Sequence, residues 1–382
     1  MRRHWTVKSN SLELDAMPFY WRMTDDQQRP EGIPAKLPIR IEADAEFDYL
    51  RFRFNDAEWG AIDLAYQQDQ TIGFINPDMG QMDTYGASVN RFVLDTLKKF
   101  SPDLVYEIGC GAGFTLKHLE KNGCRAIGID PSAYSLRWSK HLNFELINDY
   151  FSPDMFDDKP DFIYCNDVFE HIPNVIDFSK QICQSLADGG VFCFCTTNST
   201  GAIELGDISM LEHQHVNMFT RESIMKILVA AGFGSIEIAG GSYGNTFHVH
   251  AIKGGDFGGA SNAKNVTDGF FERAEACLRS FGEFYNQHPE LRCYVPLRCI
   301  PYLASVGDYG STPLHDSNEK WSGKYIDGYD LPISNLRDAS YTGGHTFFIG
   351  SMTFANEIRT SLIEKGYPRS SLVTIGDLCC ES

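Results

Sequence analysis

The stretch LVYEIGCGAGF, residues 104–114, decides the fold. An apolar run ends there at three closely spaced glycines, which are Gly109, Gly111 and Gly113. Glycines permit a tight turn, and they let a ligand approach the backbone at the N-terminus of a helix. Helical spacing then continues over residues 114–121. The stretch therefore predicts a strand, a glycine loop and a helix in the order that a nucleotide-binding α/β domain uses.

Three side chains around this loop indicate which ligand it binds. A dinucleotide fingerprint needs a glycine where Phe114 stands, so a pyrophosphate is disfavoured, and with it a nicotinamide-dependent oxidoreductase or epimerase. Glu107 puts a carboxylate at the strand tip, where it suits a cationic amino group. Asp130 ends the next strand, where a carboxylate can accept both hydroxyls of a ribose. Together these residues predict an adenosine-type ribose attached to an amino acid.

Strand-like and helix-like segments alternate on both sides of the loop. The predicted helices cover residues 82–100, 114–121, 135–141, 175–186 and 220–231. The predicted strands cover residues 104–109, 124–130, 144–149, 161–168, 189–197, 234–240 and 246–253. This order predicts a doubly wound α/β domain, with a mostly parallel seven-stranded sheet closed by an antiparallel pair.

Two further domains flank this one. Short alternating runs in residues 1–80 predict strands and loops rather than helices. A glycine-rich linker at 253–260 leads into a smaller α/β unit with helices near 265–285 and 354–365. We therefore expect three domains, at residues 1–80, 81–254 and 255–382.

The composition excludes several classes of partner. The chain has 382 residues, with 33 Lys and Arg against 51 Asp and Glu, and this charge of −18 disfavours nucleic acid and anionic lipid. We find no signal peptide and no apolar run near the ~18 residues of a membrane span, so we expect a cytoplasmic protein. The eleven cysteines form no C-x-x-C pair and are expected to be reduced and to pack as small hydrophobes. We predict no metal site.

The segment EIGCGAGF resembles the class I S-adenosylmethionine-dependent methyltransferases, and the likeness covers residues 82–253. The resemblance implies S-adenosylmethionine as the cofactor, with the three glycines facing its methionine part and Asp130 holding its ribose. It also implies that Asp149 meets the adenine amino group. Tyr85 is a candidate to cover the cofactor's carboxylate, although an aromatic residue at a helix start is the plainer interpretation. The cofactor-binding candidates are Tyr85, Glu107, Gly109, Gly111, Gly113, Asp130, Asp149, Asn166 and Asp167.

The segment EHQHVNMFT, residues 212–220, carries the candidate catalytic residues. Methyl transfer to a hydroxyl or a carbon acid needs a group that removes a proton, and histidine suits this at neutral pH. His215 is the first candidate base, followed by His213, with Glu212 beside them. The alternative is that one histidine only packs and orients the loop. His171 is interpreted as a structural residue at a helix start.

A second resemblance concerns the C-terminal region. Residues 318–333 and 346–366 resemble the C-terminal domain of sugar C-methyltransferases, which act on nucleotide-linked keto sugars. In that group a Y-x-E-H-x-x-Y-F-S segment supplies the catalytic histidine, which aligns with His215. The match departs at Glu212, Gln214 and Met218, and the N-terminal zinc cysteines of that group are absent.

The resemblance therefore implies that His215 removes the proton next to a ketone of a small-molecule acceptor, a nucleotide sugar. Two alternatives stay open. One is O-methylation of a sugar or another hydroxylated metabolite, in which the same histidine would deprotonate an alcohol. The other is a non-catalytic nucleotide-binding scaffold module, in which the departures mark lost chemistry. The oligomeric state stays open too.

Overall fold

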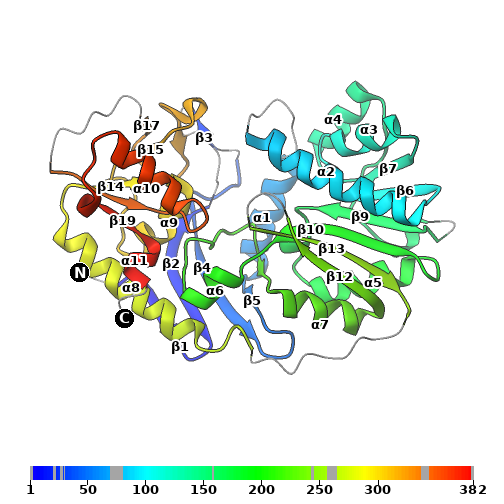
Figure 1. Ribbon diagram of the computed structural model, residues 1–382, viewed down its shortest axis with the longest axis horizontal. Helices are drawn as coiled ribbons and strands as arrows, with labels where there is room; N and C mark the ends of the chain where they lie inside the picture. The colour runs from blue at the N-terminus through cyan, green and yellow to red at the C-terminus, as the bar shows by residue number, and fades with distance from the viewer. Residues whose placement is uncertain are drawn as a thin grey trace.

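A computed structural model describes residues 3–19, 23–25, 29, 31–68, 81–156, 159–241, 245–255, 265–336 and 344–379, with side chains from residue 86 on in the segment that starts at 81. Figure 1 shows a large sheet with its helices on one side of the molecule and the N- and C-terminal elements on the other. Helix α1 (Asp56–Gln68) lies between the two sides.

The large sheet has the seven strands that the sequence predicts. In spatial order they are β12 (Phe233–Gly240), β13 (Thr246–Lys253), β10 (Val191–Thr197), β9 (Phe162–Asn166), β6 (Leu104–Ile108), β7 (Arg125–Ile129) and β8 (Glu145–Ile147). The five strands from β10 to β8 run parallel, whereas β13 is antiparallel to both β10 and β12. The prediction of a doubly wound sheet closed by an antiparallel pair is confirmed.

Helices cover both faces of this sheet (Figure 1). They are α2 (Gln81–Phe100), α3 (Phe114–Lys121), α4 (Ala133–Leu142), α5 (Val175–Ser185) and α7 (Arg221–Ala231), close to the predicted ranges. On one face Val93 of α2 and Leu116 of α3 share a core, and on the other Ile182 of α5 packs with Ile227 of α7. No helix in the described part of the chain combines the length and apolar character that crossing a bilayer requires.

A second sheet is built mainly from N-terminal strands. Its order is β1 (Trp5–Lys8), β2 (Ser11–Pro18), β4 (Lys36–Asp44), β5 (Tyr49–Phe52) and β11 (Asn217–Met218), all antiparallel. The expectation that residues 1–80 lack helices is wrong, because α1 lies there. Asn55 and Glu58 cap its first turn reciprocally, since each side chain accepts a hydrogen bond from the other's backbone N–H. Buried Ile62 and Ala65 then hold the helix in place.

The C-terminal region forms a third, smaller α/β unit. Its parallel sheet has the order β17 (Ile333–Asn335), β15 (Leu314–Asp316), β14 (Leu291–Tyr294), β18 (Thr346–Ile349) and β19 (Leu372–Thr374). Its helices are α8 (Phe270–Gln287), α9 (Pro296–Ser305), α10 (Ala355–Glu364) and α11 (Ile375–Cys379). Leu14 of β2, Phe281 of α8 and Ile300 of α9 belong to one core, so the N-terminal sheet packs on this unit.

Short elements complete the described chain. Strand β3 (Met23–Thr24) pairs with β16 (Tyr325–Ile326), and α6 (Thr200–Leu205) follows β10. Four 3-10 turns are η1 (Pro153–Met155), η2 (Phe169–His171), η3 (Glu319–Trp321) and η5 (Arg369–Ser371). Most of the predicted linker at 253–260 lies outside the described residues.

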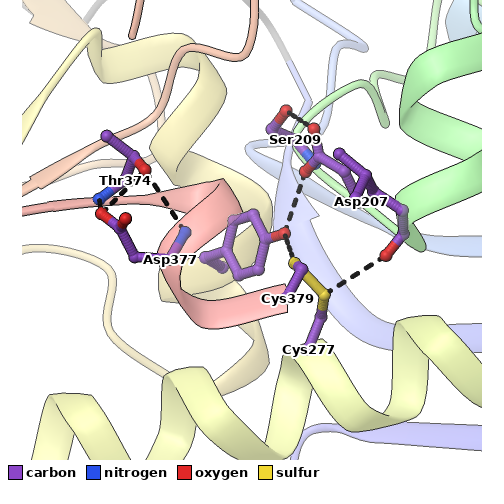
Figure 2. The surroundings of a disulfide bond; sticks show 8 residues. Asp207, Ser209, Cys277, Thr374, Asp377 and Cys379 are labelled. Atoms are coloured by element: carbon purple, nitrogen blue, oxygen red, sulfur yellow. Dashed lines mark hydrogen bonds between the residues drawn. A yellow bond between two sulfur atoms is a disulfide. The ribbon is translucent and has the colours of Figure 1, made fainter. Parts of the chain in front are cut away.

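The expectation that all cysteines are reduced is wrong for one pair. Cys277 of α8 and Cys379 of α11 form a disulfide (Figure 2), although 102 residues separate them in the chain. The hydroxyl of Tyr302 lies 3.8 Å from the Cys379 sulfur and donates to buried Asp207 at 2.9 Å. The packing of α11 on α8 creates this pair, and cysteine spacing could not reveal it. The eight free cysteines among the described residues are buried, except half-buried Cys124.

The glycine loop yields a test of the fold. Gly113 has φ +73°, and a Cβ there would lie 2.2 Å from the Phe144 ring, whereas Gly123 has φ +87° and open space around it. We expect Gly123→Ala to lose about 1 kcal/mol of unfolding free energy from backbone strain alone. Gly113→Ala should lose about 1–3 kcal/mol more, because the methyl group overpacks the core. Urea unfolding of the two variants measures the difference, and equal losses would contradict the close packing of the loop.

Candidate functional site

The glycine loop leaves β6 in a backbone shape that other residues seldom adopt. Gly109, Gly111 and Gly113 all have positive φ, at 72°, 51° and 73°. The N–H of Gly109 donates to the carbonyl of Ile129 at 2.8 Å, which ties the loop to β7. A Cβ on Gly109 would lie 2.4 Å from the Val168 side chain, so the loop is packed against the end of β9 as well. The loop therefore sits at the carboxyl edge of the sheet, where ligands of open α/β folds bind.

Asp130 fixes the neighbouring strand end to this loop. Its Oδ2 accepts a hydrogen bond from the N–H of Gly111 at 2.9 Å. Its Oδ1 accepts from the N–H and the hydroxyl of Ser132, at 2.9 and 2.6 Å. Asp149 follows β8 on the surface, where it accepts from the N–H of Tyr150 at 2.7 Å. The two acidic candidates thus follow adjacent strands, one buried and one exposed.

Buried polar atoms without partners lie at the same edge. Glu107 of β6 and Asn166 of β9 are 3% and 6% exposed. One carboxylate oxygen of Glu107 and both amide atoms of Asn166 have no hydrogen-bond partner among the described residues. Burial raises the pKa of Glu107 to about 8. Unpaired buried polar groups cost folding free energy, so these atoms are candidates for contacts with a polar ligand.

His215 forms a short ion pair with Glu212 in the loop after α6. The Nδ1 of His215 lies 2.6 Å from Oε1 of Glu212, and both side chains are largely buried. Burial disfavours the imidazolium, but the Glu212 carboxylate outweighs this effect and raises the pKa of His215. The pairing also occupies Nδ1, so Nε2 is the imidazole nitrogen left for another partner.

Glu170 and His171, in η2, stand beside this pair. Glu170 is fully buried, and its Oε2 accepts a hydrogen bond from the Thr196 hydroxyl at 2.9 Å. The Nδ1 of His171 lies 2.6 Å from the carbonyl of Gln214 and 2.7 Å from the hydroxyl of Tyr66. The rings of His171 and His215 meet edge to face, with centroids 4.8 Å apart. Burial lowers the pKa of His171 to about 3, so its imidazole is neutral at physiological pH.

His213 lies elsewhere. Its ring packs between Phe19 and Phe54, and its Nε2 is 3.1 Å from the carbonyl of Leu37. It is fully buried, which lowers its pKa to about 4. His213 therefore packs in the core, which is the alternative that the sequence analysis gave for one of the two histidines. Tyr85 lies in α2, but its side chain is outside the described residues.

Several residues of the site were missed in the sequence. His171 was interpreted as structural, yet its ring contacts His215, and Glu170 precedes it directly. Tyr66 comes from α1 and Arg298 from α9, where Arg298 donates to the carbonyl of Ser209 and acts electrostatically on Glu212. The signal that could have identified two of them is the adjacent Glu170 and His171, which are two titratable side chains just after the end of a predicted strand. Tyr66 and Arg298 carry no local signal.

Comparisons with known proteins agree on the central domain. The family model described as "Methyltransferase domain" matches residues 82–238. The ubiquinone biosynthesis O-methyltransferase of Methylobacterium sp. (strain 4-46) is 27% identical over 101 residues, which cover 25% of this chain and 41% of that protein. The enzyme of the same name from Idiomarina loihiensis is 23% identical over 154 residues, which cover 36% of this chain and 63% of that protein. The chain thus spans less than two thirds of these curated relatives.

A likeness to a solved structure is weaker. The plantazolicin methyltransferase BpumL, solved with SAH, is 17% identical and has a TM-score of 0.38, with 53% of this chain and 92% of that chain covered. The family match and the seven-stranded sheet together identify residues 82–238 as a class I S-adenosylmethionine-dependent methyltransferase domain.

Glu107 gives this site a measurable effect on stability. Its pKa is about 8 in the folded chain against 4.5 when unperturbed, so the folded state binds the extra proton between these values. The stabilisation from this proton is complete below pH 4.5 and is lost as the pH rises to about 8. We expect Glu107→Gln to gain on the order of 4 kcal/mol relative to the parent protein across that window. Urea unfolding at pH 5 to 8 measures the gain, and a difference independent of pH would contradict a buried, protonated Glu107.

Proposed function

We propose that this protein transfers a methyl group from S-adenosylmethionine to a small-molecule acceptor. The observation that carries the proposal is the buried His215–Glu212 pair at 2.6 Å, held in a chain with a methyltransferase domain. The curated relatives are named as methyltransferases, which supports the same class of reaction.

The cofactor supplies, when bound, a methyl group that a sulfonium makes electrophilic. The backbone of Gly109, Gly111 and Gly113 leaves room for its amino-acid part. The orphaned oxygen of Glu107 suits its ammonium group, and this pairing favours the ionised carboxylate. Asp130 is proposed to hold the ribose and Asp149 the adenine amino group. Asn166 and Asp167 are also proposed to contact the cofactor, and Tyr85 is proposed to cover its carboxylate.

The proposed role of His215 follows from its tautomer. The Glu212 carboxylate is proposed to accept a hydrogen bond from Nδ1–H, which leaves the lone pair of Nε2 in the neutral imidazole to take a proton from the acceptor. The imidazolium formed in that step is stabilised by the Glu212 carboxylate at 2.6 Å. Glu212 is thus proposed as a positioning residue.

Two acceptors are proposed, and each has a separate support. The C-terminal resemblance favours a nucleotide-linked keto sugar, methylated on the carbon next to the ketone. The names of the curated relatives favour O-methylation of a hydroxylated metabolite instead. In both reactions His215 removes the acceptor's proton.

We also propose that the protein acts in the cytoplasm. The three domains, at residues 1–80, 81–254 and 255–382, are proposed to meet at the acceptor site, where α1 contributes Tyr66 and α9 contributes Arg298.

Cofactor binding is the first test. We expect the purified protein to bind S-adenosylhomocysteine in a calorimeter and to give no heat with NAD. Asp130→Ala should weaken binding about 10- to 100-fold, because each hydrogen bond to a charged group contributes about 1.5–3 kcal/mol. A folded protein that binds no S-adenosylhomocysteine would favour the non-catalytic scaffold and contradict the proposal.

The base is tested separately. A screen of nucleotide-linked keto sugars and hydroxylated metabolites, with radiolabelled methyl donor, would identify an acceptor. With that acceptor, His215→Asn should lower turnover about 10²- to 10⁴-fold while S-adenosylhomocysteine binding stays the same. His141→Asn, on an exposed helix surface, is the control and should transfer methyl groups normally. An unchanged rate in His215→Asn would remove this histidine from the chemistry.

A further inference from the structure

Three side chains at the acceptor site have donor atoms of the kind that bind metal ions. One donor atom from each of Glu170, His171 and His215 lies within 4.8 Å of the other two. Two of these residues are neighbours in η2, and the third comes from the loop after α6. The spacing of residues in the sequence does not predict this group. His171 contacts the carbonyl of Gln214, the residue before His215, and these two residues are 43 positions apart in the chain.

The hydrogen bonds around these side chains decide which atoms are left over. The Nδ1 of His215 is paired with Glu212, and the Nδ1 of His171 lies 2.6 Å from the Gln214 carbonyl. Nε2 of His215 is therefore left for a further ligand, and the His171 ring, which also interacts with the backbone of Asp167, offers one of its nitrogens. The Oε2 of Glu170 is held by Thr196, but its Oε1 is buried and has no partner among the described residues. Three atoms remain, namely two imidazole nitrogens and one carboxylate oxygen.

This pattern of contacts is the one that metal-binding histidines show. A metal-ligating histidine nearly always donates its other ring N–H to a carboxylate or a backbone carbonyl, which fixes the ring and its tautomer. Here Glu212 provides the carboxylate for His215 and Gln214 the carbonyl for His171. The Tyr66 hydroxyl, 2.7 Å from the same Nδ1, completes the surroundings of His171.

We propose that Glu170, His171 and His215 bind a divalent transition-metal ion through one carboxylate oxygen and two imidazole nitrogens. Two histidines and one glutamate are a ligand set of zinc sites that leave a fourth position open. Imidazole ligands favour zinc, cobalt or nickel, whereas magnesium and calcium prefer oxygen ligands. Because zinc–ligand bonds are about 2.0–2.2 Å long, donors that now lie within 4.8 Å of one another would move closer on binding.

The metal site goes beyond the proposed function. The Nε2 lone pair of His215 cannot hold a metal ion and accept the acceptor's proton at the same time. The metal-bound state is therefore a second state of this site, and it can be tested without knowing the acceptor.

Cobalt(II) is the probe, because its visible ligand-field absorption reports the ligand geometry. The protein, freed of metal by dialysis against a chelator, should bind one cobalt ion per chain. Zinc should displace the cobalt and magnesium should not. Glu170→Gln and His171→Ala should each weaken cobalt binding at least tenfold, and Glu212→Gln should weaken it about 10- to 100-fold through the orientation of His215. His141→Ala removes an exposed histidine and should bind cobalt as the parent does.

Several results would overturn the proposal. These are the absence of cobalt absorption, equal binding by His171→Ala and His141→Ala, or thiolate-to-cobalt charge-transfer absorption, which would place the ion at a cysteine. S-adenosylhomocysteine binding, measured on each variant, shows whether that variant is folded. A parent protein that binds cobalt but no S-adenosylhomocysteine would contradict methyl transfer alone, and one with the opposite behaviour would contradict the metal site alone.

Discussion

The pairing of β11 with β5 is the constraint on which the proposed acceptor site depends. Met218 lies opposite Leu50, and the N–H of Phe52 donates to the carbonyl of Val216 at 2.8 Å. A segment of the methyltransferase domain thereby becomes the edge strand of the N-terminal sheet. The side-chain amide of Asn217 also donates to the carbonyl of Ile172 at 2.8 Å, just after η2. One short strand therefore holds His215 close to His171 and fixes both against α1.

The N-terminal sheet can impose this constraint because it is itself buried. Its strand β2 shares a core with α8 and α9, and Leu211, at the start of the loop with Glu212, belongs to the same core. That packing brings Arg298 near the ion pair. The loop that carries Glu212 and His215 is thus supported by the N-terminal sheet and by α9, which both lie outside the methyltransferase domain. Such support keeps the imidazole of His215 in one orientation, as catalysis or metal binding requires.

Features that depend on neighbouring residues could be predicted from the sequence, whereas features that depend on contacts between distant segments could not. The strand, glycine loop and helix around Gly111 follow from adjacent residues, so their ranges and the sheet could be predicted closely. Helix α1 was missed because the aromatic residues before it suggested strands, and the Asn55–Glu58 cap went unnoticed. That His171 lies beside His215, and His213 away from it, depended on β11, whose partner strand lies about 170 residues earlier in the chain. The Cys277–Cys379 pair and Arg298 are products of packing between distant elements in the same way.

The Glu212–His215 pair explains why two chemical roles, general base and metal ligand, can be proposed for the same histidine. A carboxylate 2.6 Å from Nδ1 favours a proton on that nitrogen, and when the imidazole is neutral this leaves the lone pair on Nε2. That lone pair is what a general base offers to an acceptor and what a ligand offers to a metal ion. The difference lies in the neighbours. A base needs only room for the acceptor, whereas a metal ion needs the orphaned oxygen of Glu170 and the neutral imidazole of His171 as well. Glu170 is costly to bury there, because its Oε1 has no hydrogen-bond partner among the described residues.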